Sequence, residues 1–342
     1  MPMSAATIPV SALPFPVMLI DENQIVAGLS PALAAVLGEH IKGRHFISAL
    51  RQPVTLEAIE TAMRTGQAVQ TRWLGRDGAR DTTWAVHVIP DAGRIVLTFE
   101  DRTAAEEVSQ FRRDFVANVS HELRTPLTAL QGFIETLRGA ARNDAAARER
   151  FLGIMERESA RMTQLVDDLL SLSRVEEGER QRPIQAIAIG ALVTATLADL
   201  EPVIAAAQVK VTLTDDTAGA SVLGDTNQLR QVFGNLIENA VKYGGTGGTL
   251  TVTLDAPAQH NALHAKGIAV HVQDRGPGIA QHHIPRLTER FYRVDTHRSR
   301  ALGGTGLGLA IVKHIINRHR GRLLIKSALG QGTTFTVILP QS

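Results

Sequence analysis

The sequence predicts a multidomain α+β protein with an N-terminal α/β domain, a dimeric helical hairpin that builds a four-helix bundle, and a C-terminal α/β-sandwich domain. Three observations lead to this prediction. The chain has 342 residues, and about 150 residues per domain gives two or three domains. Hydrophobic residues make up 44% and charged residues 20% of the chain, as in globular proteins. The apolar pattern changes twice, which sets the predicted domains at 1–103, 104–182 and 183–342.

Charge and cysteine content exclude several classes of protein. The 36 Lys and Arg residues against 34 Asp and Glu residues leave a net charge of +2, which excludes a strongly basic nucleic-acid coat. We therefore expect no direct nucleic-acid partner. The chain has no cysteine, so disulfides, cysteine-ligated zinc, iron–sulfur clusters and a thiol nucleophile are excluded.

No segment has the length and composition of a membrane span. The apolar stretch 8–20 contains three prolines and is shorter than the roughly 20 residues that a spanning helix needs. We expect no transmembrane segment in this chain and a cytoplasmic location. Peripheral docking on the inner membrane through a partner protein is compatible with that expectation.

The first domain alternates short apolar runs with turns. Glycines at 75, 78 and 93 mark turns between the later runs. The pattern predicts strands and short helices, and therefore a small antiparallel sheet with helices on one side. The predicted strands are 16–20, 25–27, 69–74, 81–89 and 94–100, and the predicted helices are 31–37 and 54–64.

The second domain has apolar residues three or four positions apart. One stripe runs from Val108 to Leu137 and a second from Phe151 to Leu172, and Gly139 and Asn143-Asp144 separate them. The pattern predicts two long helices joined by a short loop. One hairpin cannot bury both stripes, whereas two copies can do so as a four-helix bundle, so we expect a homodimer.

The third domain alternates strands and helices, which predicts one mixed sheet covered by helices. The predicted helices are 189–206, 227–243 and 310–320, and the predicted strands are 209–213, 249–254, 268–273, 322–326 and 333–339.

His121 on the first long helix is the candidate nucleophile. A neutral, exposed imidazole can attack a phosphoryl group. Glu122 beside it can accept a proton, and Thr125, one turn further on the same face, can position a water against a phosphorylated group. Pro126 removes a backbone hydrogen bond and allows the helix to bend. The alternative is an ordinary surface histidine, which describes most of the twelve in this chain.

The helix 227–243 carries candidate ligands for a metal and a nucleotide. Asn235 and Asn239 are four residues apart and share a face, and two amide oxygens suit a Mg²⁺ ion that keeps water and phosphate oxygens. Lys242 can reach a phosphate, and Tyr243 can pack on a purine or ribose. The alternative is a solvated helix face.

Two glycine-rich segments are candidate nucleotide contacts. Asp274 ends a predicted strand and can accept the amino group of adenine, while Gly276 and Gly278 permit a close approach of the backbone. The second segment opens a helix, where unpaired N–H groups favour phosphates. Its spacing is neither that of the Walker loop nor that of the dinucleotide fingerprint. Its candidate contacts are Gly304, Thr305, Gly306, Leu307 and Gly308.

These motifs resemble those of a known family. Residues 115–130, FVANVSHELRTPLTAL, resemble the dimerisation and phosphoacceptor segment of bacterial two-component sensor histidine kinases. The clusters at 235–243, 274–279 and 303–309 resemble, in this order, the N, G1 and G2 boxes of the family's ATP-binding domain. The resemblance covers roughly residues 105–340 and implies ATP and Mg²⁺ as cofactors.

The resemblance adds further nucleotide contacts. Residues 290–293 are similar to the F box, which implies roles for Arg290, Phe291 and Arg293, and 330–335 are similar to the last glycine box, which implies one for Thr333. Residues 279–303 would then form a mobile lid over the nucleotide. Its arginines suit a triphosphate; they are Arg286, Arg290, Arg293, Arg298 and Arg300.

Residues 283–295 and 310–321 resemble the phosphate-regulon members of the family. The resemblance implies autophosphorylation of His121 from ATP, transfer to an aspartate of a response regulator, phosphatase activity on that regulator, and a role in phosphate-starvation signalling. Residues 13–103 resemble a PAS sensor domain, with 101–103 closing its last strand.

Two alternatives remain at the level of the sequence. One is a clamp-type ATPase of the same nucleotide-binding superfamily, such as a gyrase or a chaperone. Those proteins place a water-activating glutamate where this chain has Asn235, and an amide cannot act as a base. The other alternative is a non-catalytic scaffold that dimerises and binds a regulator, against which the nucleotide motifs argue.

Overall fold

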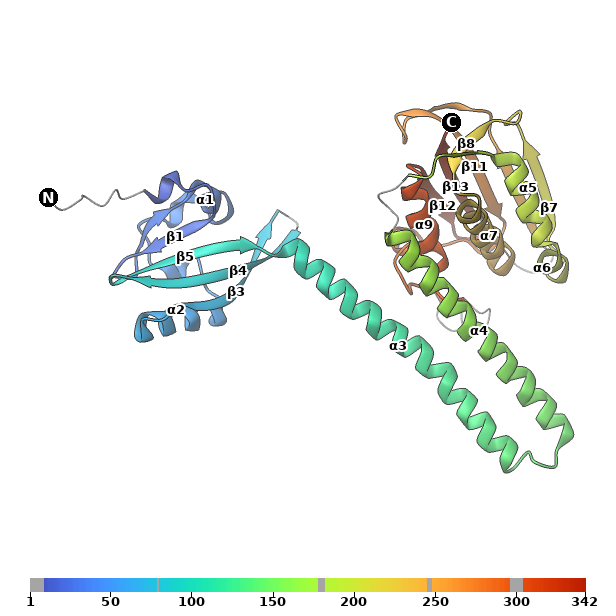
Figure 1. Cartoon of the computed structure of the whole chain (residues 1–342), viewed down its shortest axis with the longest axis horizontal. Coiled ribbons are helices and arrows are strands. Elements are labelled where there is room, and N and C mark those ends of the chain that lie inside the picture. The colour runs from blue at the N-terminus through green and yellow to red at the C-terminus, as the bar shows by residue number, and fades with distance from the viewer. Residues whose placement is uncertain (1–8, 79, 178–181, 245–247, 296–303) are drawn as a thin grey trace. The chain divides into compact units, whose positions relative to one another are not determined.

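The computed structural model divides into two compact units, Met1–Ala117 and Asn118–Ser342, which are described separately below (Figure 1). It describes residues 9–78, 80–177, 182–244, 248–295 and 304–342.

The first unit contains an antiparallel sheet of five strands in the order β2-β1-β5-β4-β3. This confirms the predicted antiparallel sheet, although β3 and β4 are longer than predicted. The strands are β1 Val17–Ile20, β2 Val26–Leu29, β3 Val69–Asp77, β4 Arg80–Asp91 and β5 Arg94–Asp101. The helices are α1 Pro31–Leu37 and α2 Pro53–Thr65, with short 3-10 turns η1 Val10–Ala12, η2 Glu39–Ile41 and η3 Phe46–Ser48.

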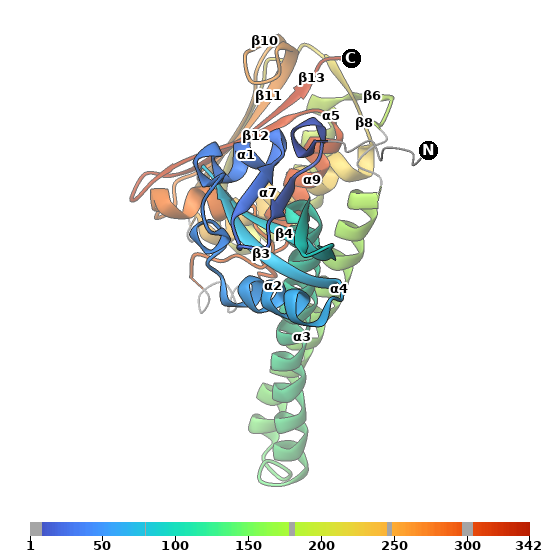
Figure 2. The same ribbon diagram turned by 90° about the vertical axis from the view of Figure 1, so that its left-hand side faces the viewer.

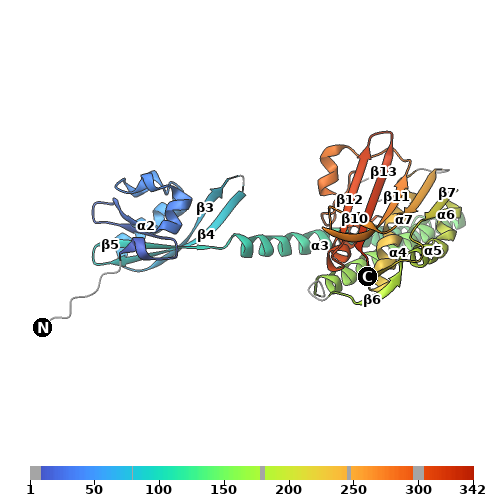
Figure 3. The same ribbon diagram turned by 90° about the horizontal axis from the view of Figure 1, so that it is seen from above.

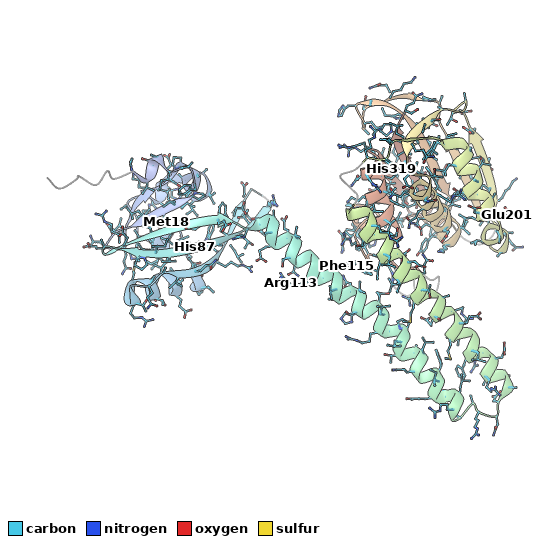
Figure 4. The ribbon with its side chains drawn as sticks, in the orientation of Figure 1. Met18, His87, Arg113, Phe115, Glu201 and His319 are labelled. Carbon is cyan, nitrogen blue, oxygen red and sulfur yellow. The ribbon has the colours of Figure 1, made fainter. Side chains whose placement is uncertain are left out.

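The core of this unit lies between the sheet and its helices. Met18 of β1 (Figure 4) and Leu97 of β5 are fully buried. The Trp73 ring meets the Phe99 ring edge-on at 5.9 Å between centroids. Each fully buried aliphatic side chain contributes about 1.5–3 kcal/mol. Ser30 caps α1 by accepting a hydrogen bond from the Leu33 N–H.

A helical hairpin follows, with α3 Thr103–Arg138 and α4 Ala145–Glu177. Both helices and the break between them are confirmed, and α3 continues without interruption through Pro126. Within the second unit the two helices run side by side (Figure 2), and the Phe133 and Phe151 rings lie 5.4 Å apart. The Asp144 carboxylate accepts a hydrogen bond from the Ala147 N–H, as a helix cap does.

The rest of the second unit is an α/β layer whose strands lie side by side in Figure 3. Its described residues form a six-stranded sheet, ordered β12-β13-β11-β9-β7 with β10 beside β11, and a two-stranded sheet of β6 and β8. The β7–β9 pair is parallel and the other described pairs are antiparallel. The strands are β6 Gln185–Ala188, β7 Lys210–Asp215, β8 Ser221–Gly224, β9 Thr249–Leu254, β10 Ala258–His260, β11 Ala265–Asp274, β12 Arg322–Ala328 and β13 Gly332–Pro340.

Helices cover one face of the larger sheet, and they pack on β9, β11 and β12. They are α5 Ile189–Asp199, α6 Glu201–Ala206, α7 Thr226–Tyr243 and α9 Gly308–Arg318, with a 3-10 turn η4 Gln281–Arg286. The single helix predicted over 189–206 is wrong, because the chain leaves helical geometry at Leu200. Pro202, which has no N–H to donate, stands in the first turn of α6.

In the part of the chain that the structure describes, no helix combines the length and the apolar character that a bilayer crossing requires.

Candidate functional site

A cavity of about 300 Å³ lies in the second unit, where α7, the loop after β11 and the start of α9 meet α4. Three of the sequence motifs converge there, although 30 residues lie between the first and the second and 23 between the second and the third. The predicted site residues that line it are Asn235, Asn239, Lys242, Tyr243, Asp274, Gly278, Arg293, Gly304, Thr305, Gly306, Gly308 and Thr333.

Helix α7 supplies the amide side of the cavity. The helix begins at Asp225, whose carboxylate caps the N–H groups of Asn227 and Gln228. Three turns later Asn235 and Asn239 face the cavity, and the Asn235 Nδ2 donates to the Gly308 carbonyl at 3.4 Å. Two amides on one face, beside an open volume, fit a Mg²⁺ ion that keeps water and phosphate ligands.

Asp274 ends β11 inside the cavity and is only 5% exposed. Its Oδ1 accepts hydrogen bonds from the N–H groups of Gly276 at 2.8 Å and Thr333 at 3.3 Å. Burial raises the pKa of Asp274 above its usual value, and these hydrogen bonds oppose that rise. The carboxylate is therefore held in a fixed orientation toward the cavity.

Two glycines are required by backbone geometry. Gly278 has φ +71°, and a Cβ there would overlap the carbonyl oxygen of Ala328. Gly306 has φ +75°, and a Cβ there would lie 2.9 Å from the backbone of Phe291. Only glycine adopts these conformations without strain, so both positions let backbone segments close around the cavity.

The N-terminus of α9 faces the same cavity. The helix begins at Gly308, and Leu307 supplies no side-chain cap in the described part of the chain. The first N–H groups of a helix carry positive partial charge and have no partner within the helix. The start of α9 therefore presents donors suited to phosphate oxygens.

Arg293 is a buried cation in the cavity wall. Its side chain is 5% exposed, and its Nη2 lies 3.0 Å from Glu122 Oε2. Its Nε has no hydrogen-bond partner among the described residues. Leaving a buried donor without a partner costs about 1–3 kcal/mol. The positive charge of the Arg293 guanidinium favours an anionic ligand in the cavity that this residue lines.

Glu122 joins α3 to the cavity wall. Its Oε2 also lies 2.9 Å from the Arg161 Nη2 on α4. His121 is exposed on α3 and is not among the residues that line the cavity. The Thr125 hydroxyl donates to the His121 carbonyl at 3.2 Å, so the predicted catalytic side chains occupy one stretch of α3.

Family models match two parts of the chain. Residues 111–178 match the His Kinase A (phospho-acceptor) domain, and residues 224–342 match the histidine kinase-, DNA gyrase B- and HSP90-like ATPase. The sensor-like histidine kinase SenX3 of Mycolicibacterium smegmatis is 35% identical over 294 residues, which are 83% of this chain and 74% of that protein.

The chain belongs to the sensor histidine kinase family.

Other similarities agree with this assignment. The phosphate regulon sensor protein PhoR of Pseudomonas aeruginosa is 41% identical over 241 residues, or 70% of this chain, and the match spans 53% of that relative's length. The solved structure of the Acinetobacter baumannii histidine kinase AdeS matches with a TM-score of 0.50 and 28% identity, covering 65% of this chain and 98% of that one. Histidine kinase ThkA, solved in complex with the response regulator protein TrrA, shares the fold over 96% of both chains, with a TM-score of 0.54 and 19% identity.

Several predicted site residues of this kinase lie outside the cavity wall. Gly276 and Leu307 are buried beside it. Phe291 has φ +61° and donates its N–H to the Gly306 carbonyl at 2.8 Å, so it braces the glycine segment. Burial lowers the pKa of Arg290 to about 10.

In the predicted lid Arg298, Arg300 and Gly303 lie outside the described residues, and Arg286 stacks over the Tyr292 ring at 4.3 Å.

Two residues of the kinase hairpin line the cavity and were not predicted from the sequence. Gln164 and Asp168 of α4 face it, and Asp168 Oδ2 accepts a hydrogen bond from the Thr305 hydroxyl at 2.6 Å. One sequence feature could have indicated Asp168. It lies three residues after Leu165 and four before Leu172, so a charged side chain stands on the apolar stripe of the helix.

Proposed function

We propose that this family member uses ATP to phosphorylate its own His121. The observation that carries the proposal is Arg293, a buried guanidinium with an unpartnered Nε in the cavity wall, bonded to the residue next to His121. A site for an anion and a candidate phosphoacceptor are therefore connected through one side chain.

In this proposal ATP lies across the cavity, with its adenine at Asp274 and its phosphates at the start of α9. The Asp274 carboxylate accepts the adenine amino group, and the phosphates lie at the N-terminus of α9, where donors and positive partial charge favour anions. Asn239 and Asn235 would hold a Mg²⁺ ion that neutralises phosphate charge. Lys242, which pairs with Glu238 at 2.8 Å, and Tyr243 complete this side of the site.

The chemistry is a phosphoryl transfer to nitrogen. The lone pair of the neutral His121 Nε2 forms a bond to the γ-phosphorus, the bond to the β–γ bridging oxygen breaks, and ADP leaves with that electron pair. Glu122 takes the imidazole Nδ1 proton. Since Glu122 holds Arg293 in this arrangement, the transfer requires that contact to open, which frees Arg293 to contact the phosphates.

The phosphorylated histidine passes its phosphoryl group to an aspartate of a response regulator. The likeness to ThkA, solved with its regulator, supports a partner of this kind, and Thr125 would position the water that dephosphorylates the regulator. The similarity to PhoR supports a role in phosphate-starvation signalling.

The kinase functions as a homodimer in this proposal. Large apolar side chains of the hairpin stay exposed at heptad-like intervals, which is the spacing of a helix face that packs on other helices. They are Leu127, Ile134, Leu152, Val166 and Leu170. Pairing two hairpins in a four-helix bundle would cover them.

The domain assignment of the proposal has three parts. Residues 1–103 form a PAS-like sensor domain, 104–182 the dimerisation and phosphotransfer hairpin, and 183–342 the ATP-binding domain. The five-stranded antiparallel sheet with α1 and α2 beside it supports the first part. A cytoplasmic location, with peripheral docking through a membrane partner, completes the proposal.

Labelling with γ-³²P ATP tests the function. The chain should become labelled in the presence of Mg²⁺, and His121→Gln should lose the label while it keeps its affinity for ATP. Replacing a second exposed histidine, His40→Gln, is the matched control and should leave labelling unchanged. Persistent labelling of His121→Gln would overturn the assignment, and steady ATP hydrolysis without phosphoprotein would favour the clamp-type ATPase.

A further inference from the structure

Asp168 places a negative charge in the wall of the cavity that we assign to ATP. It comes from α4, not from the ATP-binding domain, and it is 6% exposed. Its carboxylate accepts hydrogen bonds from the Thr305 hydroxyl at 2.6 Å and from Gln164 Nε2 at 2.9 Å. A buried carboxylate at a site for phosphates is unexpected, because like charges repel strongly where water is excluded.

The contact with Thr305 reaches the phosphate-binding part of the cavity. Thr305 lies three residues before α9 begins, and its hydroxyl also accepts the Leu307 N–H at 3.3 Å. It lines both the cavity and a small adjoining hollow beside Pro126 and Leu165. Asp168 therefore holds the glycine segment 304–308 against the hairpin.

A second bond ties the same helix to the ATP-binding domain. The Ser171 hydroxyl of α4 donates to Gln231 Oε1 of α7 at 2.9 Å, and α4 also packs on α9. Docking of this domain on α4 is therefore what brings the Asp168 carboxylate into the nucleotide site. When the domain leaves α4, the carboxylate leaves the site.

We propose that Asp168 is a specificity-determining residue of the nucleotide site. While the ATP-binding domain is docked on α4, the Asp168 carboxylate repels the phosphates of a nucleotide. The Asp168–Thr305 contact and the binding of ATP therefore compete. This inference rests on the proposed function, since it takes the occupant to be ATP. The opposition grows with the number of phosphates, so the docked arrangement discriminates most strongly against ATP, less against ADP and hardly against adenosine.

Charged neighbours are consistent with this role. Burial raises the pKa of Asp168, and the negative charge of Glu238 raises it as well. The hydrogen bonds from Thr305 and Gln164 and the positive charge of Lys242 lower that pKa. Lys242 is itself paired with Glu238 at 2.8 Å. Lys242 is thus shared between two carboxylates on this side of the cavity.

Binding of three ligands by the full chain tests the proposal. Adenosine, ADP and a non-hydrolysable ATP analogue are titrated with Mg²⁺ into the wild-type chain, Asp168→Asn and Asp167→Asn. Asp168→Asn keeps an oxygen for the Thr305 hydroxyl and removes the charge. Asp167 is exposed, so Asp167→Asn makes the same change of net charge outside the cavity.

We expect Asp168→Asn to raise affinity for the ATP analogue about tenfold and for ADP about threefold, with adenosine within twofold of wild type. Asp167→Asn should change the affinity for none of the three ligands by more than about twofold.

An equal change in affinity for all three ligands would overturn the inference, because it would show a purely structural role of Asp168. Weaker Mg²⁺-dependent binding would overturn it as well, because Asp168 would then be a metal ligand. Failure of the wild-type chain to bind any of the three would instead overturn the proposed function.

Discussion

Glu122 on α3 and Arg293, 171 residues later in the sequence, meet at 3.0 Å between Oε2 and Nη2. Arg161 of α4 shares the same carboxylate oxygen at 2.9 Å. The side chain beside the candidate phosphoacceptor thus anchors a segment of the nucleotide cavity. This contact holds the ATP-binding domain against the hairpin in an arrangement that leaves His121 outside the cavity.

Glu122→Ala should destabilise the second unit, because it removes the carboxylate that the largely buried Arg293 and Arg161 share, and Arg161 keeps the longer contact with Glu158 at 3.6 Å. Removing one partner of a buried ion pair costs about 3–5 kcal/mol, and we expect a loss near the lower end, since Glu122 is 16% exposed. Urea unfolding followed by far-ultraviolet circular dichroism measures it.

Asp199→Ala is the matched control for that variant. It breaks the ion pair of Asp199 with Arg230, whose side chains are half-exposed, and exposed pairs contribute about 0–1 kcal/mol. Equal small losses in the two variants would show that the Glu122 contacts do not stabilise the docked arrangement.

Gly278→Ala should abolish most nucleotide binding. Gly278 and Gly330 both have positive φ, at +71° and +76°, but only at Gly278 would a Cβ overlap neighbouring backbone. Alanine at either position pays about 1–2 kcal/mol for the left-handed conformation, and the overlap at 278 adds displacement of the cavity wall. We expect at least a tenfold loss of affinity for an ATP analogue in Gly278→Ala and less than threefold in Gly330→Ala, measured by titration calorimetry. Similar losses in both would contradict the close approach.

The stability of the second unit should fall as the pH falls below about 6.5, the ordinary pKa of histidine, because of His319. This residue, at the end of α9 (Figure 4), is fully buried. Its ring contacts the Ile315 carbonyl through Nδ1 at 2.7 Å and accepts the Asp225 N–H through Nε2 at 3.0 Å. Burial lowers the pKa of His319, Arg318 and Arg182 lower it further, and the Ile315 carbonyl and Asp225 oppose this.

The sign of this dependence follows from proton binding. Below the ordinary pKa of histidine the unfolded chain binds a proton that the folded chain excludes. The free energy of unfolding therefore decreases as the pH decreases. Urea unfolding at pH 7.5 and 5.5 should show a larger loss for the wild type than for His319→Gln, which does not titrate there. Equal losses would exclude His319 as the cause.

Thr103→Val should destabilise the first unit by about 1–3 kcal/mol, since it leaves the Thr83 N–H without the acceptor that Thr103 Oγ1 provides at 3.0 Å. Both tryptophans of the chain, Trp73 and Trp84, lie in this unit, so their fluorescence follows its unfolding selectively. The exposed Thr65→Val is the control and should change stability by less than about 0.5 kcal/mol. No difference between the two variants would contradict the role of Thr103.

Elements with strong periodicity could be predicted from the sequence, and short ones could not. The end of α3 and the start of α4 follow from Gly139 and Asp144, which interrupt the apolar stripes. The strands β6, β8 and β10 were not predicted, because three or four residues carry too little alternation and depend on pairing with distant partners. The break at Leu200 was missed because Pro202 fits a helix start as well as a helix end.

The residues of the candidate site also fall into those that the sequence predicts and those that it does not. Asn235, Asp274 and Gly278 belong to local motifs, in which residue type and spacing indicate the chemistry. Asp168 was missed because its role comes from packing of two domains, with Thr305 placed 137 residues away in the chain. Local patterns predict what a segment can bind, whereas the contacts that oppose binding depend on the tertiary fold.

Locating the phosphoryl group tests the central claim most directly. The chain is incubated with ATP and Mg²⁺, digested at alkaline pH, where phosphohistidine is preserved, and its peptides are sequenced by mass spectrometry. We predict one phosphoryl group on the peptide that contains His121, with fragment ions that place it on His121 itself. Phosphate on Ser120, Thr125 or any other residue in place of His121, or no phosphopeptide from a chain that binds ATP, would contradict the account.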